Sequence, residues 1–174
     1  MNTLHILMGT PGSGKSTWIQ NHLDEHTVWI SRDDVRFSMV AEDEEYFSKE
    51  KQVFKEFIRR INNALENGYD VFADATHLNK ASRNKLLRAV NPQLALNVDV
   101  IWIKTSLDEC LKRNNNRIGT RSFVPKSVIR RMFFQIEKPE FEEGFNTIYI
   151  VEDNQPIKVY KEVLHDTCDN VSIN

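Results

Sequence analysis

Short apolar segments alternate along the chain with longer segments in which apolar residues recur every three or four positions. The short segments predict buried strands at about 4–8, 28–30, 71–73, 96–103 and 147–151. The longer segments predict helices at about 15–23, 44–66, 81–90 and 107–113, then one beginning at Pro125 and a last one over 156–164. This alternation predicts an α/β fold with a mostly parallel sheet and helices on both faces. Ligands of such sheets bind at the C-terminal ends of the strands.

Length and composition then limit the possible classes of protein. The 174 residues predict a single domain over 1–174. Hydrophobic residues make up 40% and charged residues 28%, which excludes a disordered chain. The 23 Lys+Arg and 25 Asp+Glu give a net charge of -2. This balance excludes a surface coated in positive charge for non-specific nucleic-acid binding, but it allows a local basic site.

The cysteine content and the apolar stretches bear on the cellular compartment. Two cysteines, Cys110 and Cys168, are too few for a disulfide framework or a zinc site, and they predict reduced thiols. The N-terminus lacks the basic start of a signal peptide, and the longest apolar stretches have the length of strands. We therefore expect a cytoplasmic protein without a membrane segment. Oligomeric state is left open.

Residues 9–16, Gly-Thr-Pro-Gly-Ser-Gly-Lys-Ser, fit the phosphate-binding pattern G-x-x-x-x-G-K-[ST] between a predicted strand and a predicted helix. The glycines allow the backbone to curl so that its N–H groups point at a phosphate chain, next to a helix N-terminus. Lys15 is expected to reach the β- and γ-phosphates of ATP, and the Ser16 hydroxyl to ligate Mg²⁺. The expected ATP-binding residues of this P-loop are Gly9, Gly12, Ser13, Gly14, Lys15, Ser16 and Thr17.

A second group of polar residues, at 31–36, directly follows the second predicted strand. A kinase needs a carboxylate here to accept the proton of the acceptor hydroxyl, and a cation to hold an anionic acceptor. Asp33 and Arg36 supply these groups and share one face if a helix starts here; alternatively, the segment is a helix cap with solvated charges. Asp74 ends the third strand, where it either organises the water around Mg²⁺, braces an arginine of the acceptor site, or only caps a turn.

Residues 112–131 contain seven basic residues and no acidic one. Arg113 and Arg117 lie four apart at the end of a predicted helix, where both can face a phosphate chain. Three asparagines lie between them and Gly119 follows, which predicts a lid-like segment at about 113–125 that closes over ATP. The alternative is a solvated basic face, and the role of Arg121 stays open.

Together these elements resemble the kinase domain of bacteriophage polynucleotide 5′-kinases over residues 1 to about 150. The P-loop is shared by many enzymes that bind nucleotides, and the other elements are more specific. The resemblance rests on the P-loop at 9–16, Arg-Asp-Asp-Val-Arg at 32–36, Asp-Ala-Thr-His-Leu-Asn at 74–79, the arginine segment at 112–120 and Val-Pro at 124–125. It implies an adenylate-kinase-like core with a parallel sheet of four or five strands.

The resemblance also implies a reaction and a role for each residue. The γ-phosphate of ATP, with Mg²⁺, passes to the 5′-hydroxyl end of DNA or RNA, as in the repair of nucleic-acid ends. Asp33 is then the general base, and Arg36 holds the 3′-phosphate of the acceptor with support from Asp74. Arg113 and Arg117 grip the ATP phosphates. The expected catalytic residues are Lys15, Asp33 and Arg117.

The sequence also departs from that family and leaves alternatives open. Family members often continue into a phosphatase domain that opens with Asp-x-Asp-Gly-Thr, and this string is absent, so we expect no 3′-phosphatase activity. The alternatives are a small-molecule or nucleoside kinase on the same fold, and a non-catalytic module gated by ATP that needs the P-loop but not Asp33. Phe37 and Phe123 are candidates for stacking on a base. If a phage encodes the protein, the compartment is the host cytoplasm.

Overall fold

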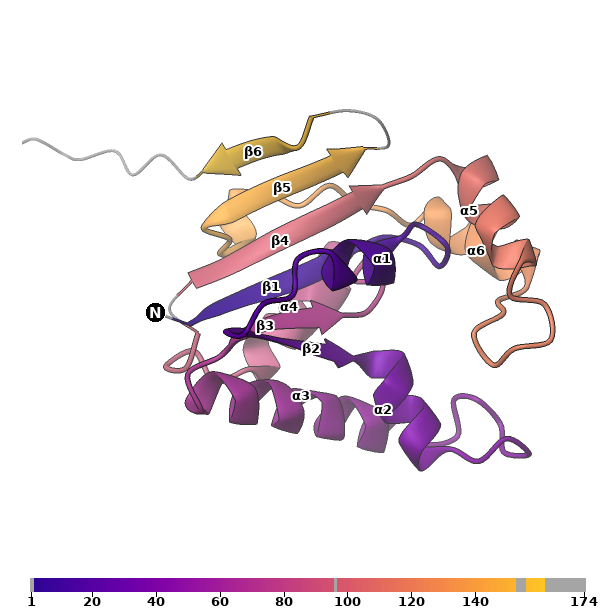
Figure 1. Cartoon of the computed structure of the whole chain (residues 1–174), viewed down its shortest axis with the longest axis horizontal. Helices are drawn as coiled ribbons and strands as arrows, with labels where there is room; N and C mark the ends of the chain where they lie inside the picture. The colour runs from indigo at the N-terminus through magenta and orange to yellow at the C-terminus, as the bar shows by residue number, and fades with distance from the viewer. Residues whose placement is uncertain (1, 96, 153–155, 162–174) are drawn as a thin grey trace, which may run out of the picture.

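The computed structural model describes residues 2–95, 97–152 and 156–161, and within them six strands form one sheet in the order β2-β3-β1-β4-β5-β6 (Figure 1). Neighbouring strands from β2 to β5 run parallel, and β6 runs antiparallel to β5. The predicted α/β fold with a mostly parallel sheet is therefore confirmed. The strands are β1 Thr3–Met8, β2 Thr27–Ser31, β3 Asp70–Asp74, β4 Asn97–Lys104, β5 Thr147–Glu152 and β6 Lys158–Lys161.

Helices pack on both faces of the sheet because the strands are apolar on both faces. Leu4 and Ile6 of β1 face a core shared with α3 and α4, whereas Leu7 faces a smaller core that includes Ile19 of α1. Both sides of β1 are therefore buried, as expected for a central strand. The helices are α1 Lys15–Gln20, α2 Arg32–Met39, α3 Glu50–Glu66, α4 Lys80–Ala89, α5 Leu107–Asn115 and α6 Lys126–Phe133, with a 3₁₀ turn η1 at Phe141–Glu143.

Two of the predicted helices differ from the structure. The helix predicted over 44–66 begins only at Glu50, and residues 42–49 form turns that carry exposed side chains. The helix predicted over 156–164 is wrong for 158–161, which form β6, and residues 162–164 lie outside the described part of the chain. All four side chains of β6 are exposed, so side-chain burial does not account for this strand. The open edge of β5 instead offers backbone hydrogen bonds.

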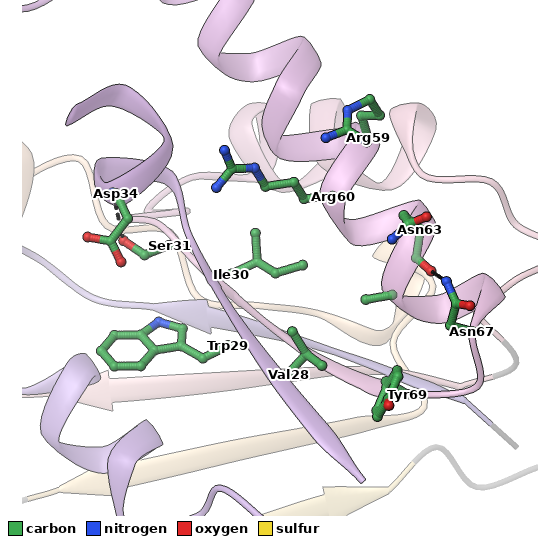
Figure 2. Close-up of a pocket in the computed structure, with 11 residues that line it drawn as sticks. Val28, Trp29, Ile30, Ser31, Asp34, Arg59, Arg60, Asn63, Asn67 and Tyr69 are labelled. Carbon is green, nitrogen blue, oxygen red and sulfur yellow. Dashed lines mark hydrogen bonds between the residues drawn. The ribbon is translucent and has the colours of Figure 1, made fainter. Parts of the chain in front are cut away.

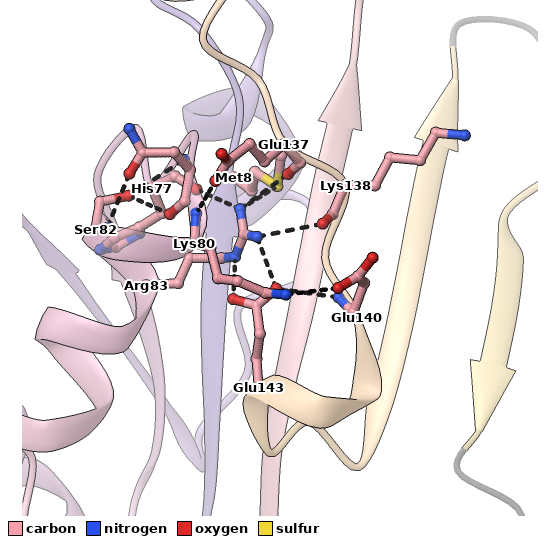
Figure 3. Close-up of polar contacts among 10 residues, drawn as sticks. Met8, His77, Lys80, Ser82, Arg83, Glu137, Lys138, Glu140 and Glu143 are labelled. Atoms are coloured by element: carbon pink, nitrogen blue, oxygen red, sulfur yellow. Dashed lines mark hydrogen bonds and ion pairs between the residues drawn. The ribbon is translucent and has the colours of Figure 1, made fainter.

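A buried ion pair ties η1 to the start of α4 (Figure 3). The guanidinium of Arg83 donates to both carboxylate oxygens of Glu143 at 2.8 and 2.7 Å, and both side chains are almost fully buried. It also donates to the carbonyl oxygens of His77, Glu137 and Lys138 at 3.0–3.3 Å. Every donor of a buried guanidinium needs an acceptor, so Arg83 holds the β3–α4 turn against the chain that leads into β5.

The same turn contacts the P-loop. The backbone N–H of Gly9 donates to the carbonyl oxygen of Thr76 at 3.0 Å. The imidazole Nδ1 of His77 lies 2.8 Å from the carbonyl oxygen of Leu7 in β1. Burial lowers the pKa of His77 to about 4, so the ring is neutral near neutral pH and serves as a structural hydrogen-bonding group. Within the described residues no helix is both long and apolar enough to cross a bilayer.

Candidate functional site

The P-loop joins the C-terminal end of β1 to α1 and encloses the side chain of Lys15. The Lys15 ammonium donates to the carbonyl oxygens of Gly9 and Thr10 at 2.9 and 3.2 Å. The backbone N–H of Ser13 donates to the same Thr10 carbonyl at 3.1 Å, which closes the curl. Ser16 is half-buried on the first turn of α1, and Thr17 beside it is exposed. The ammonium therefore occupies the concave side of the loop, where the motif requires a cation.

Helix α5 supports the outer side of the P-loop. Gly12 has a φ of 82°, and a Cβ placed on it would lie 2.5 Å from the carbonyl oxygen of Cys110, so only glycine fits. The carbonyl of Ser13 accepts hydrogen bonds from the Thr105 hydroxyl at 2.8 Å and from the Arg113 guanidinium at 3.0 Å. Arg113 also pairs with Glu109 at 2.9 Å. Its observed contacts thus brace the P-loop backbone, a role that sequence spacing did not predict.

The predicted pair Asp33 and Arg36 meets on α2. Arg36 is only 5% exposed, and its guanidinium donates to Asp33 Oδ1 at 2.5 Å and to Glu50 Oε2 of α3 at 2.8 Å. The side chain of Asp33 is 61% exposed, so its carboxylate is held in place and still open to solvent. Glu50 also pairs with Arg32. Ser31 caps the helix by accepting from the backbone N–H of Asp34, which fixes the start of α2 at the end of β2.

Tyr46, in the loop between α2 and α3, is a second partner of this pair. Its hydroxyl donates to Asp33 Oδ1 at 2.8 Å and accepts from Arg36 at 3.0 Å. Burial, followed by the neighbouring Asp33 carboxylate, raises the pKa of Tyr46 to about 12, so the hydroxyl keeps its proton. Sequence reasoning did not identify Tyr46 or Glu50. Each lies in a different segment from Arg36, and no local spacing signals the contact.

Asp74 ends β3 at the same edge of the sheet, opposite Leu7 of β1 and Ser31 of β2. The indole N–H of Trp29 donates to Asp74 Oδ2 at 3.1 Å. Burial raises the pKa of Asp74, while the nearby Lys15 ammonium and the Trp29 hydrogen bond act in the opposite direction. The described contacts of Arg36 do not include Asp74, and it is Glu50 that braces this arginine. Asp74 instead belongs with Lys15 and the P-loop.

The charged groups from four segments converge around Lys15. Burial lowers the pKa of the Lys15 ammonium. The carboxylates of Asp74 and Asp33 raise this pKa, and the cation of Arg117 lowers it further. Asp74, Asp33 and Arg117 are therefore close enough to Lys15 to act on its charge. Among the described residues, Arg117 has no hydrogen-bonding or ion-pairing partner for its side chain. Two neighbouring cations, Lys15 and Arg117, repel each other unless an anion lies between them.

The loop between α5 and α6, residues 116–125, carries Arg117. Asn114 closes the base of the loop, because its side chain accepts from the backbone N–H of Val124 at 3.1 Å and donates to the Val124 carbonyl at 2.8 Å. Arg121, which the sequence left open, donates to the carbonyl oxygen of Val40 at 2.7 Å, and its guanidinium lies 4.6 Å from the centre of the Phe37 ring. The loop therefore extends from the neighbourhood of Lys15 to the end of α2.

The oxygen atoms of the side chains near Lys15 can be compared with the ligands that a magnesium ion requires. In the described part of the chain, no cluster of three or more His, Cys, Asp or Glu side chains forms a metal cage of its own. Mg²⁺ keeps several waters and takes one or two protein oxygens beside the phosphates of a nucleotide. Ser16 at the start of α1 and Asp74 beside Lys15 provide such oxygens. These residues therefore fit a magnesium ion that arrives with a nucleotide.

A separate open cavity of about 410 Å³ lies between β2 and α3 (Figure 2). Its lining includes Ser31 and Asp34 at one end and Tyr69 at the other, with Arg60 of α3 along the side. The lining does not include Lys15 or any other P-loop residue, nor Asp33. The cavity is therefore distinct from the place where the charged groups converge.

The fold and the phosphate-binding loop together define a P-loop domain. The chain belongs to the AAA domain family, whose sequence model matches residues 4–139. A search of curated proteins found no match.

Solved structures share this fold. A chain in the structure of the Pnkp1/Rnl/Hen1 RNA repair complex is 25% identical with a TM-score of 0.69, and the match covers 96% of this chain and 50% of that one. The present chain thus spans about half the length of that chain. A sugar kinase from Janibacter sp. is 18% identical, with a TM-score of 0.59 and coverage of 90% and 88%. Kti12 from Chaetomium thermophilum, solved with ADP-AlF₃, is 16% identical, with a TM-score of 0.55 and coverage of 87% and 89%.

Proposed function

We propose that the protein is an ATP-dependent polynucleotide kinase that transfers the γ-phosphate of ATP to the 5′-hydroxyl end of DNA or RNA. One observation carries the proposal: the exposed Asp33 carboxylate is fixed by the buried Arg36 and lies within electrostatic reach of Lys15. A proton acceptor within electrostatic reach of the cation in the P-loop supports the transfer of a phosphoryl group to a hydroxyl. The similarity to a chain of an RNA repair complex supports a nucleic-acid acceptor.

The geometry of Asp33 suits a general base. Arg36 and Tyr46 both donate to Oδ1, and no described residue donates to Oδ2. In the proposed reaction the acceptor hydroxyl gives its proton to Asp33 as its oxygen attacks the γ-phosphorus. The bond from that phosphorus to the β,γ-bridging oxygen breaks, and ADP leaves. Orientation of the carboxylate by two donors keeps the second oxygen available for this proton.

The cations supply the charge stabilisation. Lys15 and Arg117 repel each other in the structure, and the phosphates of ATP would relieve that repulsion. Arg113 holds the Ser13 carbonyl and so keeps the P-loop N–H groups in place. When bound, Mg²⁺ would neutralise charge on the β- and γ-phosphates, with Ser16 as its protein ligand. The loop at 116–125 is proposed to act as the lid, since Arg117 and Arg121 lie on it.

Arg36 is the proposed holder of the acceptor phosphate. Within the described part of the chain, its buried Nε finds no hydrogen-bond partner, and a buried donor without an acceptor points to a missing ligand oxygen. Arg36→Lys is expected to raise the KM for the acceptor roughly 10- to 100-fold, because a charge-assisted hydrogen bond is lost. The KM for ATP should change little. Steady-state kinetics with each substrate varied in turn measures both, and equal increases would contradict the assignment.

The test of the function compares acceptors. Purified protein is incubated with Mg²⁺ and ATP labelled at the γ-phosphate, together with a 5′-hydroxyl oligonucleotide, free nucleosides or simple sugars. Label on the oligonucleotide alone is the expected result. Preferred labelling of nucleosides or sugars would identify a small-molecule kinase. Label released only to water, or retained in ATP, would indicate a nucleotide-gated module and contradict the proposal.

A further inference from the structure

Three aromatic rings lie side by side next to the Asp33–Arg36 pair. The Tyr46 ring lies 4.8 Å from Phe47 and 6.4 Å from Phe37, centre to centre, and both pairs are edge-to-face. Phe47 is 60% exposed, and Tyr46 is 38% exposed. Phe47 packs against neither main core of the sheet. A cluster of exposed rings, unlike a single exposed ring, is typical of a binding surface.

Two arginines are interleaved with these rings. The guanidinium of Arg36 lies 4.5 Å from the centre of Tyr46 and 5.5 Å from that of Phe47. Arg121 lies over Phe37 at 4.6 Å. Alternating aromatic faces and guanidinium groups are typical of surfaces that hold single nucleotides, where bases stack on rings and cations attract phosphates.

The position of the three aromatic rings relative to Asp33 determines which part of a bound acceptor they can contact. Tyr46 donates its hydroxyl to Asp33, and Phe47 is the next residue along the chain. Both the α2–α3 loop that carries them and the α5–α6 loop that carries Arg121 project from the edge where the parallel strands end (Figure 1). A molecule whose hydroxyl reaches Asp33 therefore lies next to Tyr46, with the Phe47 ring beside it.

We propose that Phe47, supported by Tyr46 and Phe37, is the subsite for the nucleobase of the acceptor's 5′-terminal nucleotide. This inference rests on the proposed polynucleotide kinase function and adds a base contact to it. The 5′-hydroxyl reaches Asp33 while the base of the same nucleotide stacks on the open face of Phe47. Because every base has a π-face, the subsite accepts all four bases and recognises the presence of a base rather than its identity.

The experiment is a cycle of two changes, one in the protein and one in the acceptor. Transfer is measured with a 5′-hydroxyl oligonucleotide and with the same oligonucleotide whose 5′-terminal nucleotide lacks its base. Phe47→Ala should lower kcat/KM for the intact acceptor roughly 5- to 100-fold, mainly through the acceptor KM. The abasic acceptor has already lost the stacking contact, so Phe47→Ala should have little effect on it. Phe47→Trp should restore transfer to the intact acceptor.

Phe134 provides the matched control. It is 80% exposed at the end of α6, where its ring contacts Phe133, and Phe134→Ala should leave both acceptors unaffected. Equal losses on the two acceptors with Phe47→Ala, or no loss on either, would overturn the base subsite while the kinase function stands. If the unaltered protein labels neither oligonucleotide, the proposed function fails and the subsite fails with it.

Discussion

Replacement of Asp33 by asparagine is expected to slow phosphoryl transfer by roughly 10²- to 10⁴-fold and to leave ATP binding almost unchanged. The amide keeps the size of the carboxylate and still offers an oxygen to Arg36 and Tyr46. It cannot take a proton from the acceptor hydroxyl at neutral pH. The rate is measured as kcat with a 5′-hydroxyl oligonucleotide, and ATP affinity is measured by calorimetry on the same variant.

Asp34 is the matched control for this variant. It is the next residue on α2 and is exposed, and its side chain makes no hydrogen bond to Arg36 or Tyr46 among the described contacts. Asp34→Asn removes the same charge from the same helix turn, so it should keep most of the activity. Near-normal turnover by Asp33→Asn would contradict the general-base role. Equal losses in the two variants would show that the carboxylates act only through the local field.

The fold could be predicted from sequence wherever one segment carries its own signal. The strands from β1 to β5 are apolar runs bounded by turns, and parallel order follows from the helices between them. β6 could not be predicted in this way, because Lys158, Val159 and Tyr160 are all exposed and carry no burial pattern. Their conformation depends on the free edge of β5, which exists only after the sheet has formed.

Site residues could likewise be predicted only where a single segment carries the signal. The P-loop is a continuous motif, so its position at the end of β1 followed from the sequence. The partners of Arg36 did not, since Glu50 and Tyr46 reach it only through the packing of α3 and its preceding loop. Arg113 shows a further limit: the spacing placed it near the phosphate site, and its contact with the Ser13 carbonyl depends on how α5 docks against the P-loop.

The largest expected effect on stability comes from Arg83→Met. Loss of one partner of a buried ion pair leaves the other charge uncompensated, and this costs about 3–5 kcal/mol in the free energy of unfolding. Here the Glu143 carboxylate would be stranded almost without solvent, and the carbonyls of His77 and Glu137 would each lose a donor. Urea denaturation followed by circular dichroism measures the change.

A double variant separates the ion pair from the backbone contacts. Arg83→Met combined with Glu143→Met removes both charges, so stability should recover in part relative to Arg83→Met alone. Recovery should stay incomplete, because the backbone carbonyls that Arg83 satisfies remain without their donor. Equal stability of Arg83→Met and the unaltered protein would contradict this account. Since Thr76, beside His77, accepts from Gly9 of the P-loop, a loosened β3–α4 turn should also weaken ATP binding in Arg83→Met.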